Sequence, residues 1–594
     1  MPDRLRQMLV IFYLGLLVLG LRLLQLQVLE HDRYATQSRG NYLKTEYVPA
    51  PRGRILDRAG VVLAKNRVAY DLYYAGGEVR FAHRILDLLH LDELPEVRGE
   101  PVVLAANLPE ELVPTLAELV AGQENLWLKE RVERTYPHPI TGSVIGYVQG
   151  PSKEDLKRGY LPEDLVGRAG IEAALEDRLR GTPGLKLVER DARGAVLREV
   201  LLVPPKPGED VRLTLDYELQ LAAERALAAA LADLNAGRRK HHLPEEEKVR
   251  GAAVVLDPLT GGVLAMASSP GFDPNVFVRR PVDSEEIRAL MRDPARPLLN
   301  RAVQAYTPGS TFKPVSASGL LESGLVSPRR VYRCVPYVIY GGQKRRNWSS
   351  RDLGPMTVEE ALAWSCNTWF YQAVIDAGPL TSLDAIEKRA RELGLGAGTG
   401  IELAEKTGLV PSREWKRQKL GKPWYPGETL SVAIGQGPIL ATPLQLARAY
   451  AAIFTGYLPR AHLVAAEPQR EKVPGRFFSP IRRGLRKTVT EGTARSRLGD
   501  FPVPTAGKTG TAETPGKRAG LEHAWYAGYG PWPPNPEYRP VVVVAMVENG
   551  GEGSQVALPV VKRVMAAFWG ITGGDAAGGD SRGAVPAAGR GGER

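Results

Sequence analysis

Ser310 and Lys313 stand three residues apart in the stretch AYTPGSTFKPVSASGLLESG, which covers residues 305–324. Pro308 and Gly309 are turn residues, and apolar residues at roughly helical spacing follow, so we expect Ser310 at or near the start of a helix. Residues i and i+3 share one helix face, which would put the lysine amine beside the serine hydroxyl. A serine attacks an amide poorly until a base removes its proton, and a neutral lysine can be that base. The pair therefore suggests serine acyl transfer, although S-x-x-K alone has little specificity.

Two further short motifs follow along the chain. They are Ser365-Cys366-Asn367 and Lys508-Thr509-Gly510-Thr511. Ser365 lies 55 residues after Ser310, and Lys508 lies 143 residues after Ser365. In this order the three motifs resemble the set shared by serine β-lactamases and penicillin-binding proteins. The resemblance implies a serine acyl-enzyme.

The first two motifs then take roles that suit their chemistry. Ser310 would be the nucleophile and Lys313 its base, provided that the pKa of Lys313 is lowered. Burial and a second lysine, Lys508, would both lower this pKa because they disfavour the ammonium form. Ser365 and Asn367 would relay a proton to the leaving amine and hold the substrate amide.

The third motif would bind the carboxylate of the substrate. Lys508 supplies a positive charge for this purpose, and Thr509 and Thr511 supply hydroxyl groups. Gly510 lets its strand lie close to the acyl chain. The backbone amides of Ser310 and Thr511 are the expected donors to the oxyanion.

A second Lys-Thr-Gly copy begins at Lys406, 41 residues after Ser365. A lysine that faces the nucleophile across a cleft should lie on an edge strand. Lys406 instead precedes Gly-Leu-Val-Pro and a polar helical pattern, which is typical of a turn. Lys508 is followed by small residues, a loop and two strongly apolar segments. We therefore expect Lys508, and not Lys406, to serve the site.

The surrounding elements predict a layered α/β domain. Residues 251–270 read as a hairpin of two apolar strands, residues 523–532 and 538–550 as two more strands, and residues 558–571 as a closing helix. Strands at both ends of this region, with helices between them, predict a central antiparallel sheet that the C-terminus completes and helices flank. Thr357 and Glu360 form a capping box that predicts a helix running into Ser365.

The N-terminus contains an apolar run from Met8 to Leu29. As a helix this run is about 33 Å long, which is enough to span the apolar core of a membrane. Basic residues precede it and acidic residues follow it, so we expect a cytoplasmic N-terminus and a catalytic region outside, in the periplasm. No small-x-small cleavage site comes after it, which predicts an uncleaved anchor. Arg22, Gln25 and Gln27 within the run suggest a partner helix.

Length and composition divide the rest of the chain. The 594 residues exceed one ordinary domain. We expect a cytoplasmic tip and anchor over residues 1–30, a pedestal over 31–208, a domain that carries the three motifs over 209–572 and a disordered tail over 573–594. The pedestal includes a predicted hairpin around the turn at residues 57–60 and carries no catalytic grouping.

Charge and cysteine content exclude several other classes. The net charge is +11, but acidic residues are interspersed with the basic ones and no nucleic-acid motif is present, so we expect no nucleic-acid partner. The eight histidines show no metal-ligand spacing, and we expect neither a metal nor a cofactor. Cys334 and Cys366 are the only cysteines. We expect them to be unpaired core residues, with a single bridge as the alternative.

Several longer segments extend the resemblance over nearly the whole chain after the anchor. They are PRGRILDRAGVVLAKN, GRAGIEAALEDRLRG, TLDYELQLAAERAL, YTPGSTFKP, GQGPILATPLQLA and KTGTAE…HAWYAGYGP…VVVAMVENGG. Together they resemble class B penicillin-binding proteins. His523-Ala-Trp525 and residues 547–551 are more similar to the elongation branch of this family, penicillin-binding protein 2, than to its division branch.

The resemblance implies a membrane-anchored D,D-transpeptidase that cross-links peptidoglycan stem peptides and that β-lactams trap at Ser310. It also implies a polytopic membrane glycosyltransferase of the RodA type as a partner, bound through the anchor and the pedestal. A division-specific transpeptidase, a serine β-lactamase and an inactive scaffold are the alternatives. A β-lactamase needs a carboxylate that activates water, and no convincing Glu-x-x-x-Asn lies between the second and third motifs. The intact motif set argues against a scaffold.

Overall fold

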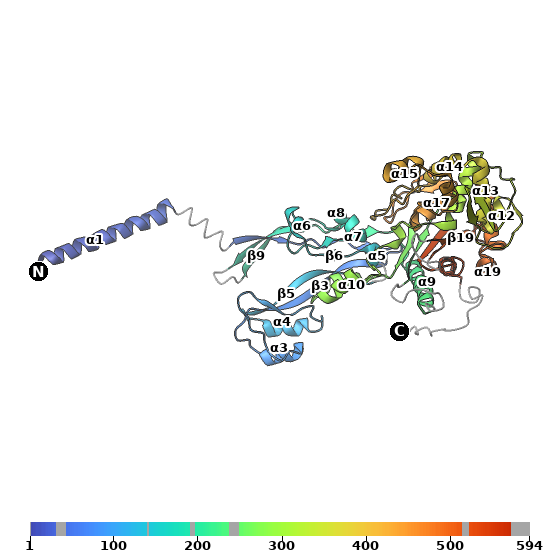
Figure 1. Cartoon of the computed structure of the whole chain (residues 1–594). Helices are drawn as coiled ribbons and strands as arrows, with labels where there is room; N and C mark the ends of the chain where they lie inside the picture. Colours follow the sequence, from blue (N-terminus) through green and yellow to red (C-terminus); the bar gives the residue numbers. More distant parts are fainter. Residues whose placement is uncertain are drawn as a thin grey trace, which may run out of the picture.

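The computed structural model describes residues 2–30, 43–138, 142–190, 196–236, 249–513 and 522–571. The tail predicted at residues 573–594 lies outside these ranges. Figure 1 shows the helix α1 at one end of the molecule, a region of long strands in the middle and a larger layered region at the other end.

A five-stranded sheet forms the centre of the layered region, and every neighbouring pair in it is antiparallel. Its strands, in spatial order, are β12 (Val263–Ser269), β11 (Arg250–Leu256), β21 (Val541–Glu548), β20 (His523–Gly530) and β19 (Ala506–Ala512). The hairpin and the two C-terminal strands predicted from sequence are thus confirmed, and the end of the chain does complete the sheet. Strand β19 lies at one edge.

Both faces of this sheet are buried, and alternate residues face opposite sides. On β11, Ala253 and Val255 belong to a core that includes α9 (Tyr217–Ala236) and α20 (Ala557–Phe568). Ala252 and Val254 belong to the larger core on the other side. Burial on both faces explains why these strands are almost continuously apolar.

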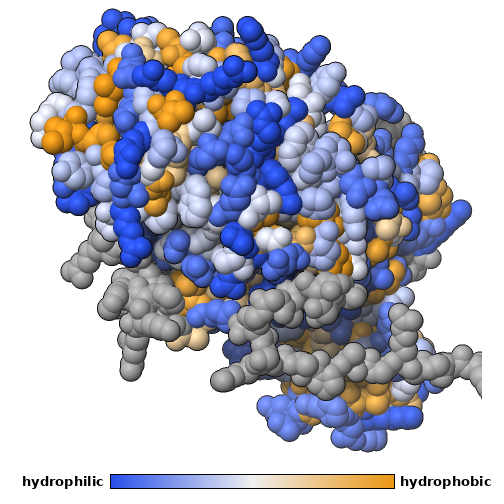
Figure 2. All heavy atoms as spheres, turned by 90° about the vertical axis from the view of Figure 1, so that its right-hand side faces the viewer, coloured by the Kyte–Doolittle hydropathy of each residue, from blue (hydrophilic) through white to orange (hydrophobic). Residues whose placement is uncertain are grey.

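The larger core packs the sheet against a second layer of helices, which carries two of the three motifs. The helices of this layer are α11 (Lys313–Glu322), α12 (Val358–Ala363), α13 (Asn367–Ala377), α14 (Pro379–Glu392), α16 (Pro426–Ala433), α17 (Pro443–Thr455) and α18 (Phe478–Thr490). Helices α15 (Arg413–Leu420) and α19 (Arg495–Leu498) complete this region, whereas α10 (Ser284–Arg292) lies toward the middle region in the view of Figure 1. The surface that Figure 2 shows is mostly hydrophilic, with scattered apolar patches.

The middle region contains two larger sheets and a short strand pair. One sheet joins β1 (Leu43–Val48), β8 (Gly184–Arg190) and β9 (Val196–Val203), and the other joins β10 (Val211–Arg212), β2 (Ile55–Leu56), β3 (Val62–Tyr74), β4 (Val102–Ala105) and β5 (Leu126–Thr135). Strands β6 (Val148–Gln149) and β7 (Val166–Gly167) form the pair. The helices here are α3 (Ala82–Leu89), α4 (Val113–Val120), α5 (Gly142–Ile145), α6 (Lys153–Lys157), α7 (Gly170–Ala174) and α8 (Glu176–Leu179). The hairpin predicted around residues 57–60 is formed by β2 and β3.

The strand predicted after Asp210 is β10, and it pairs in parallel with β2. It therefore belongs to a sheet of the middle region, while α9, which comes next, packs on the layered region. Residues 211–217 thus connect the two regions directly.

A buried ionic cluster explains two of the longer segments in the sequence. Arg52 and Arg134 both donate to the carboxylate of Glu172, each from Nε at 2.7 Å. Arg52 also donates to Glu176 at 2.6 Å. Removing one partner would leave an uncompensated buried charge, which typically costs about 3–5 kcal/mol. The cluster fixes residue 52, beside β2, to α7 and α8.

The N-terminal element is α1 (Pro2–Leu24), continued by one π-helical turn over Gln25–Leu29. Residues 7–28 are long and apolar enough to cross a membrane, with a mean hydropathy of 2.2. Arg22 donates to Gln25 at 2.7 Å, and Gln25 donates to Glu30 at 2.8 Å. Two of the three polar side chains that suggested a partner helix thus already have partners within their own segment.

Candidate active site

Ser310 lies in a 3₁₀ turn, Gly309–Phe312, which leads directly into α11 at Lys313. The Lys313 backbone N–H donates to the Ser310 carbonyl oxygen, so the turn and the helix are continuous. Ser310 is partly exposed, whereas Lys313 is fully buried. The nucleophile predicted from sequence is therefore accessible, and its neighbouring amine is not.

Buried aromatic residues hold the turn that precedes Ser310. The Trp525 indole donates to the Thr307 carbonyl oxygen, and the Tyr450 hydroxyl donates to the Thr311 carbonyl oxygen, both at 3.0 Å. Trp525 is the last residue of the His-Ala-Trp segment on β20. That segment thus supports the nucleophile without touching the reacting atoms.

Close backbone packing explains two glycines near the nucleophile. The Gly309 N–H donates to the Gly435 carbonyl oxygen at 3.0 Å. Gly435 has a φ of +77°, and a Cβ atom there would lie 2.0 Å from the Gly309 carbonyl oxygen. A Cβ at Gly309, whose φ is +54°, would lie 2.7 Å from the Thr511 carbonyl oxygen. Only glycine fits at either position, so the Gly-Gln-Gly segment is a backbone support for the Ser310 turn.

The second motif interrupts a helix instead of ending one. The capping box of Thr357 and Glu360 is present, but α12 ends at Ala363 and a new helix, α13, begins at Asn367. Ser365 lies between them with a φ of +54°. For a non-glycine residue this conformation costs on the order of 1–3 kcal/mol, and it persists only where the surroundings impose it. The expectation of one helix running into Ser365 was wrong because this residue takes a left-handed conformation.

The second motif surrounds the buried amine of Lys313. Lys313 Nζ lies 2.7 Å from the Ser365 carbonyl oxygen, 3.2 Å from Ser365 Oγ and 2.7 Å from Asn367 Oδ1. The ring of Phe370 lies 5.5 Å from the same nitrogen and helps to keep water away. The structure thus brings together Lys313, Ser365 and Asn367, as the sequence predicted.

The third motif lies on the edge strand β19, where the sequence placed it. Lys508 is fully buried and donates to the Thr509 carbonyl oxygen at 3.1 Å. Thr511 is exposed, and its carbonyl oxygen accepts from the Gln436 side chain at 3.4 Å. Of the predicted carboxylate ligands, Thr511 is the one that faces solvent.

Thr509 has a partner that sequence reasoning missed. Its hydroxyl lies 2.7 Å from the hydroxyl of Thr493, which precedes α19. Thr493 lies in none of the segments that carried the family resemblance, so no sequence signal pointed to it. Gln436 lies in the Gly-Gln-Gly segment, but that segment had no assigned role.

Burial changes the charge state of both lysines. The pKa of Lys313 lies well below its usual value, first because burial desolvates the ammonium form and second because the charge of Lys508 repels it. Burial lowers the pKa of Lys508 to about 7. Both effects favour the free amine of Lys313, the form that can accept a proton, while Lys508, with a pKa of about 7, keeps a share of its positive charge near neutral pH.

The second Lys-Thr-Gly copy lies in a different environment. Lys406 is exposed in a loop, and its backbone N–H donates to the Val303 carbonyl oxygen at 3.0 Å. Gly408, two residues on, has a φ of +66°. This is the turn context expected from the sequence, without a buried amine.

The two cysteines form a disulfide bond, so the expectation of unpaired thiols was wrong. Cys334 and Cys366 lie 32 residues apart in sequence, with a Cα–Cα distance of 6.1 Å. The chain that enters at β13 (Tyr332–Arg333) brings Cys334 against the start of α13, a long-range contact that cysteine spacing does not reveal. Among the described residues, no three histidine, cysteine or acidic side chains are grouped to hold a metal.

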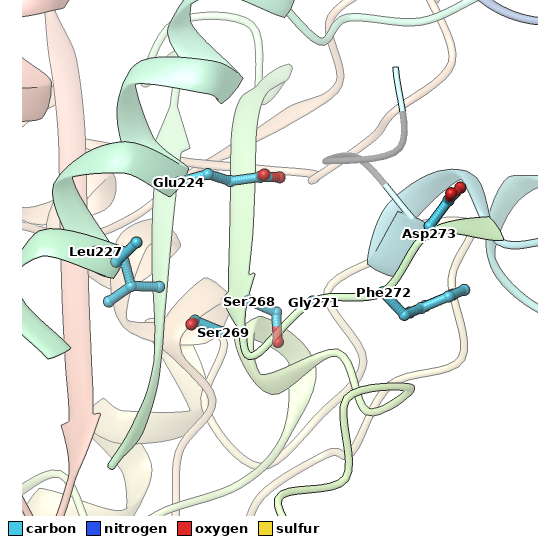
Figure 3. A pocket seen from close by; sticks show the side chains of 8 residues that line it. Glu224, Leu227, Ser268, Ser269, Gly271, Phe272 and Asp273 are labelled. Atoms are coloured by element: carbon cyan, nitrogen blue, oxygen red, sulfur yellow. The ribbon is translucent and has the colours of Figure 1, made fainter. Parts of the chain in front are cut away.

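A hollow of about 380 Å³ beside α9 is not this site. Figure 3 shows that Glu224 and Leu227 of α9 line it together with residues 268, 269 and 271–273, at and after the end of β12. Burial raises the pKa of Glu224 to about 8. The Ser268 hydroxyl, however, donates to the Leu299 carbonyl oxygen at 3.0 Å, and the lining contains no lysine or histidine to activate a serine. The hollow therefore lacks a serine with a lysine beside it in sequence, which the Ser310 site has.

Comparisons with known proteins match most of the chain. The family model described as "Penicillin binding protein transpeptidase domain" matches residues 251–566, and the one described as "Penicillin-binding Protein dimerisation domain" matches residues 47–213. A curated relative from Haemophilus influenzae, named peptidoglycan D,D-transpeptidase MrdA, is 32% identical over 615 residues. The match covers 93% of this chain and 90% of the relative.

Two solved structures are similar over most of their length. One, described as "Structural coordination of polymerization and crosslinking by a peptidoglycan synthase complex", is 61% identical, with a TM-score of 0.83 and coverage of 96% of this chain and 99% of the other. A complex of penicillin-binding protein 2 with MreC from Helicobacter pylori is 26% identical, with a TM-score of 0.73 and coverage of 89% and 99%. The chain therefore has the same fold as these two proteins and is similar to both in sequence.

Proposed function

The chain belongs to the penicillin-binding protein transpeptidases, and from this premise we propose how its own residues carry out the reaction. It is a membrane-anchored peptidoglycan D,D-transpeptidase of the elongation type, which works through a serine acyl-enzyme and binds β-lactams. We assign the nucleophile to Ser310, the general base to Lys313, and the remaining polar groups of the site to Ser365, Asn367 and Lys508.

In the acylation step, Ser310 Oγ attacks the carbonyl carbon of the penultimate D-alanine of a stem peptide. Lys313 accepts the hydroxyl proton because its amine is held neutral. The amides of Ser310 and Thr511 donate to the developing oxyanion. Lys508, through its ammonium form, attracts the terminal carboxylate, and Thr511 adds an exposed hydroxyl.

Collapse of the tetrahedral intermediate breaks the peptide C–N bond. The proton that Lys313 took passes through Ser365 Oγ, 3.2 Å from Nζ, to the leaving amine of D-alanine. In the second half of the reaction an amine of a neighbouring stem peptide attacks the ester and returns a proton along the same route. Ser310 is then free again, and the cross-link is formed.

One observation carries the assignment: a fully buried lysine amine is surrounded by the second motif and repelled by the lysine of the third. A lysine in a structural role would pair with a carboxylate, yet its three nearest described partners are neutral oxygens. This arrangement favours the free amine, and Ser310 is the partly exposed hydroxyl on the turn before it, whereas the buried Thr311 hydroxyl donates to the Pro308 carbonyl oxygen.

Trapping with penicillin tests this proposal. The full-length chain in detergent should form a covalent adduct with a fluorescent penicillin, and mass mapping should place that adduct on the peptide containing Ser310. The adduct should persist far longer than its formation takes. Rapid release of hydrolysed penicillin would indicate a β-lactamase instead, and a lack of labelling would indicate a scaffold.

We propose a separate role for each of three consecutive parts of the chain. We assign residues 1–30 to the cytoplasmic tip and anchor, residues 31–208 to the pedestal and residues 209–572 to the transpeptidase domain, whose first strand, β10, completes a sheet of the pedestal by pairing with β2. Arg4 and Arg6 precede the apolar run, which favours a cytoplasmic N-terminus and a catalytic domain outside the membrane.

We propose that a separate protein supplies the glycan strands. The two family models that match the chain describe a transpeptidase domain and a dimerisation domain. A structurally similar protein belongs to a complex that couples polymerisation to crosslinking. We therefore propose a polytopic glycosyltransferase of the RodA type as the partner, contacted by the anchor and by the pedestal just outside the membrane.

Replacing residues 2–29 with an unrelated apolar helix tests the role of the anchor. We expect weaker co-purification with the glycosyltransferase and less glycan polymerisation, while penicillin acylation of Ser310 stays unchanged. Arg22 and Gln25 are already bonded to each other, and polar contacts between membrane helices are worth only about 1 kcal/mol. The loss should therefore be partial, with the pedestal retaining the rest. Unaltered binding and polymerisation would show that the anchor is only a tether.

A further inference from the structure

The disulfide bond ends inside the second catalytic motif. Cys366 lies between Ser365 and Asn367 and is the N-cap residue of α13, where its sulfur accepts from the Trp369 N–H at 3.3 Å. Its partner, Cys334, lies on the chain segment directly after β13. Both cysteines are fully buried. The bond therefore ties the polar motif around Lys313 to a separate loop.

Asn347 also connects the second motif to the loop that carries Cys334. It comes directly after β15 (Gln343–Arg346), which pairs with β14 (Tyr337–Tyr340). Its side-chain oxygen accepts from the Asn367 N–H at 2.9 Å, and its side-chain nitrogen lies 3.5 Å from the sulfur of Cys334. The Asn347 backbone N–H donates to the Pro336 carbonyl oxygen at 2.8 Å, which anchors Asn347 to the loop after Cys334.

We call Cys334, Asn347 and Cys366 the clamp. Ser365, with its φ of +54°, lies directly before Cys366. The Cys366 N–H also donates to the Ala361 carbonyl oxygen of α12, at 2.9 Å. The backbone around Ser365 is therefore held to α12 as well as to the clamp. A left-handed serine relaxes when its neighbours are released. Relaxation here would move the Ser365 carbonyl, Ser365 Oγ and Asn367 Oδ1, which are the three groups around Lys313 Nζ.

We propose that the clamp positions the second motif for acylation, so that Cys334, Asn347 and Cys366 act on the reaction through Ser365 and Asn367. The proposal rests on the assignment of Ser310 and Lys313 above. It makes the disulfide more than a stabilising cross-link: the acylation rate depends on it even when the protein remains folded.

The test separates binding from chemistry. Penicillin binds first, with a dissociation constant Kd, and then acylates Ser310 with a first-order rate constant. We expect Asn347→Ala and the double variant Cys334→Ala with Cys366→Ala each to lower that rate constant at least about tenfold, with Kd changed by less than about twofold. The measurement is made well below the melting temperature of each variant, so that lost stability alone does not alter it.

Asn125→Ala is the matched control. The Asn125 side chain donates to the carbonyl oxygens of Gly76 and Glu78, at 2.8 and 2.9 Å, within the pedestal. Its loss removes two hydrogen bonds at a place remote from the three motifs in sequence and fold. This variant should melt at a lower temperature and acylate at the unchanged rate.

Chemical reduction gives a second route that does not depend on refolding a variant. A water-soluble phosphine attacks the disulfide and is hydrolysed to its oxide, with the oxygen taken from one water molecule; the two electrons come from the phosphine and the two protons from that water, giving two thiols, which thiol counting verifies. We expect the acylation rate of the wild-type chain to fall on reduction and to return after reoxidation, while the double variant does not respond.

Unchanged acylation rate constants in folded Asn347→Ala and in the double variant would overturn the proposal and leave the disulfide as a stabilising bond. If the double variant does not fold, the reduced wild-type chain and Asn347→Ala decide the matter. A wild-type chain that forms no adduct at Ser310 would contradict the proposed function itself, which is a distinguishable result.

Discussion

Replacing Ser310 with alanine is expected to abolish covalent labelling by penicillin while the protein still folds. The hydroxyl oxygen is the atom that forms the ester, so no adduct can form without it. The side chain is partly exposed in the 3₁₀ turn that leads into α11, and its removal leaves no large cavity. Labelling with a fluorescent penicillin, together with a thermal melting curve, measures both outcomes.

Ser316→Ala is a suitable control because this serine lies on α11, the helix that directly follows the turn of Ser310. Ser316 is fully buried, and its hydroxyl has no hydrogen-bond partner in the part of the chain that the structure describes. Its removal should leave labelling unchanged and should not lower the melting temperature, since an unpaired buried hydroxyl is itself unfavourable. Persistent labelling of Ser310→Ala would show that the nucleophile is misassigned.

The grouping of Lys313 with the second motif could be predicted from the sequence because each motif is a short local pattern. Ser310 and Lys313 are close in sequence, and the turn before them is marked by Pro308 and Gly309. The choice of Lys508 over Lys406 rested on the residues that come after each lysine in the chain. The structure places Lys508 in an edge strand and Lys406 in an exposed loop.

The groups that support these residues could not be predicted, since their contacts join distant parts of the chain. Asn347 meets Asn367, Gln436 meets Thr511, and Tyr450 meets Thr311, the last across 139 residues. Asn347 and Tyr450 stand in no local pattern that differs from ordinary surface or core sequence, and Gln436 lies in the Gly-Gln-Gly segment, to which the sequence assigned no role. The disulfide was missed for the same reason, because two cysteines 32 residues apart give no indication of their distance in space.

In the fold, too, local patterns could be predicted and long-range pairings could not. The strands of the central sheet were recognisable from continuous apolar runs with turn residues between them, and the alternation of their side chains between two cores results from strand geometry. The placement of β10 was not recognisable, since two residues of strand can pair in either of two adjacent sheets. The break at Ser365 was also hidden, because a capping box marks where a helix begins and not where it ends.

Lys508→Ala is expected to lower the second-order rate constant of acylation by about 10²–10³-fold, which corresponds to about 3–4 kcal/mol of transition-state stabilisation. The variant loses the ammonium that attracts the carboxylate of penicillin or of a stem peptide. It also loses the charge that helps to keep Lys313 neutral, so the pKa of Lys313 should rise. Acylation needs the free amine, and the rise of the rate with increasing pH should therefore shift to higher pH.

Lys406→Ala supplies the comparison that decides between the two Lys-Thr-Gly copies. Lys406 is exposed, and the hydrogen bond from its backbone to Val303 survives the substitution, so neither the rate nor its pH dependence should change by more than about twofold. The experiment is a pH series of acylation rates for the wild-type chain and both variants, with melting curves to show that each is folded. An equal loss of rate in the two variants, or a Lys508→Ala profile that keeps the wild-type pH dependence, would contradict the assignment of Lys508 as the lysine that faces Ser310 and lowers the pKa of Lys313.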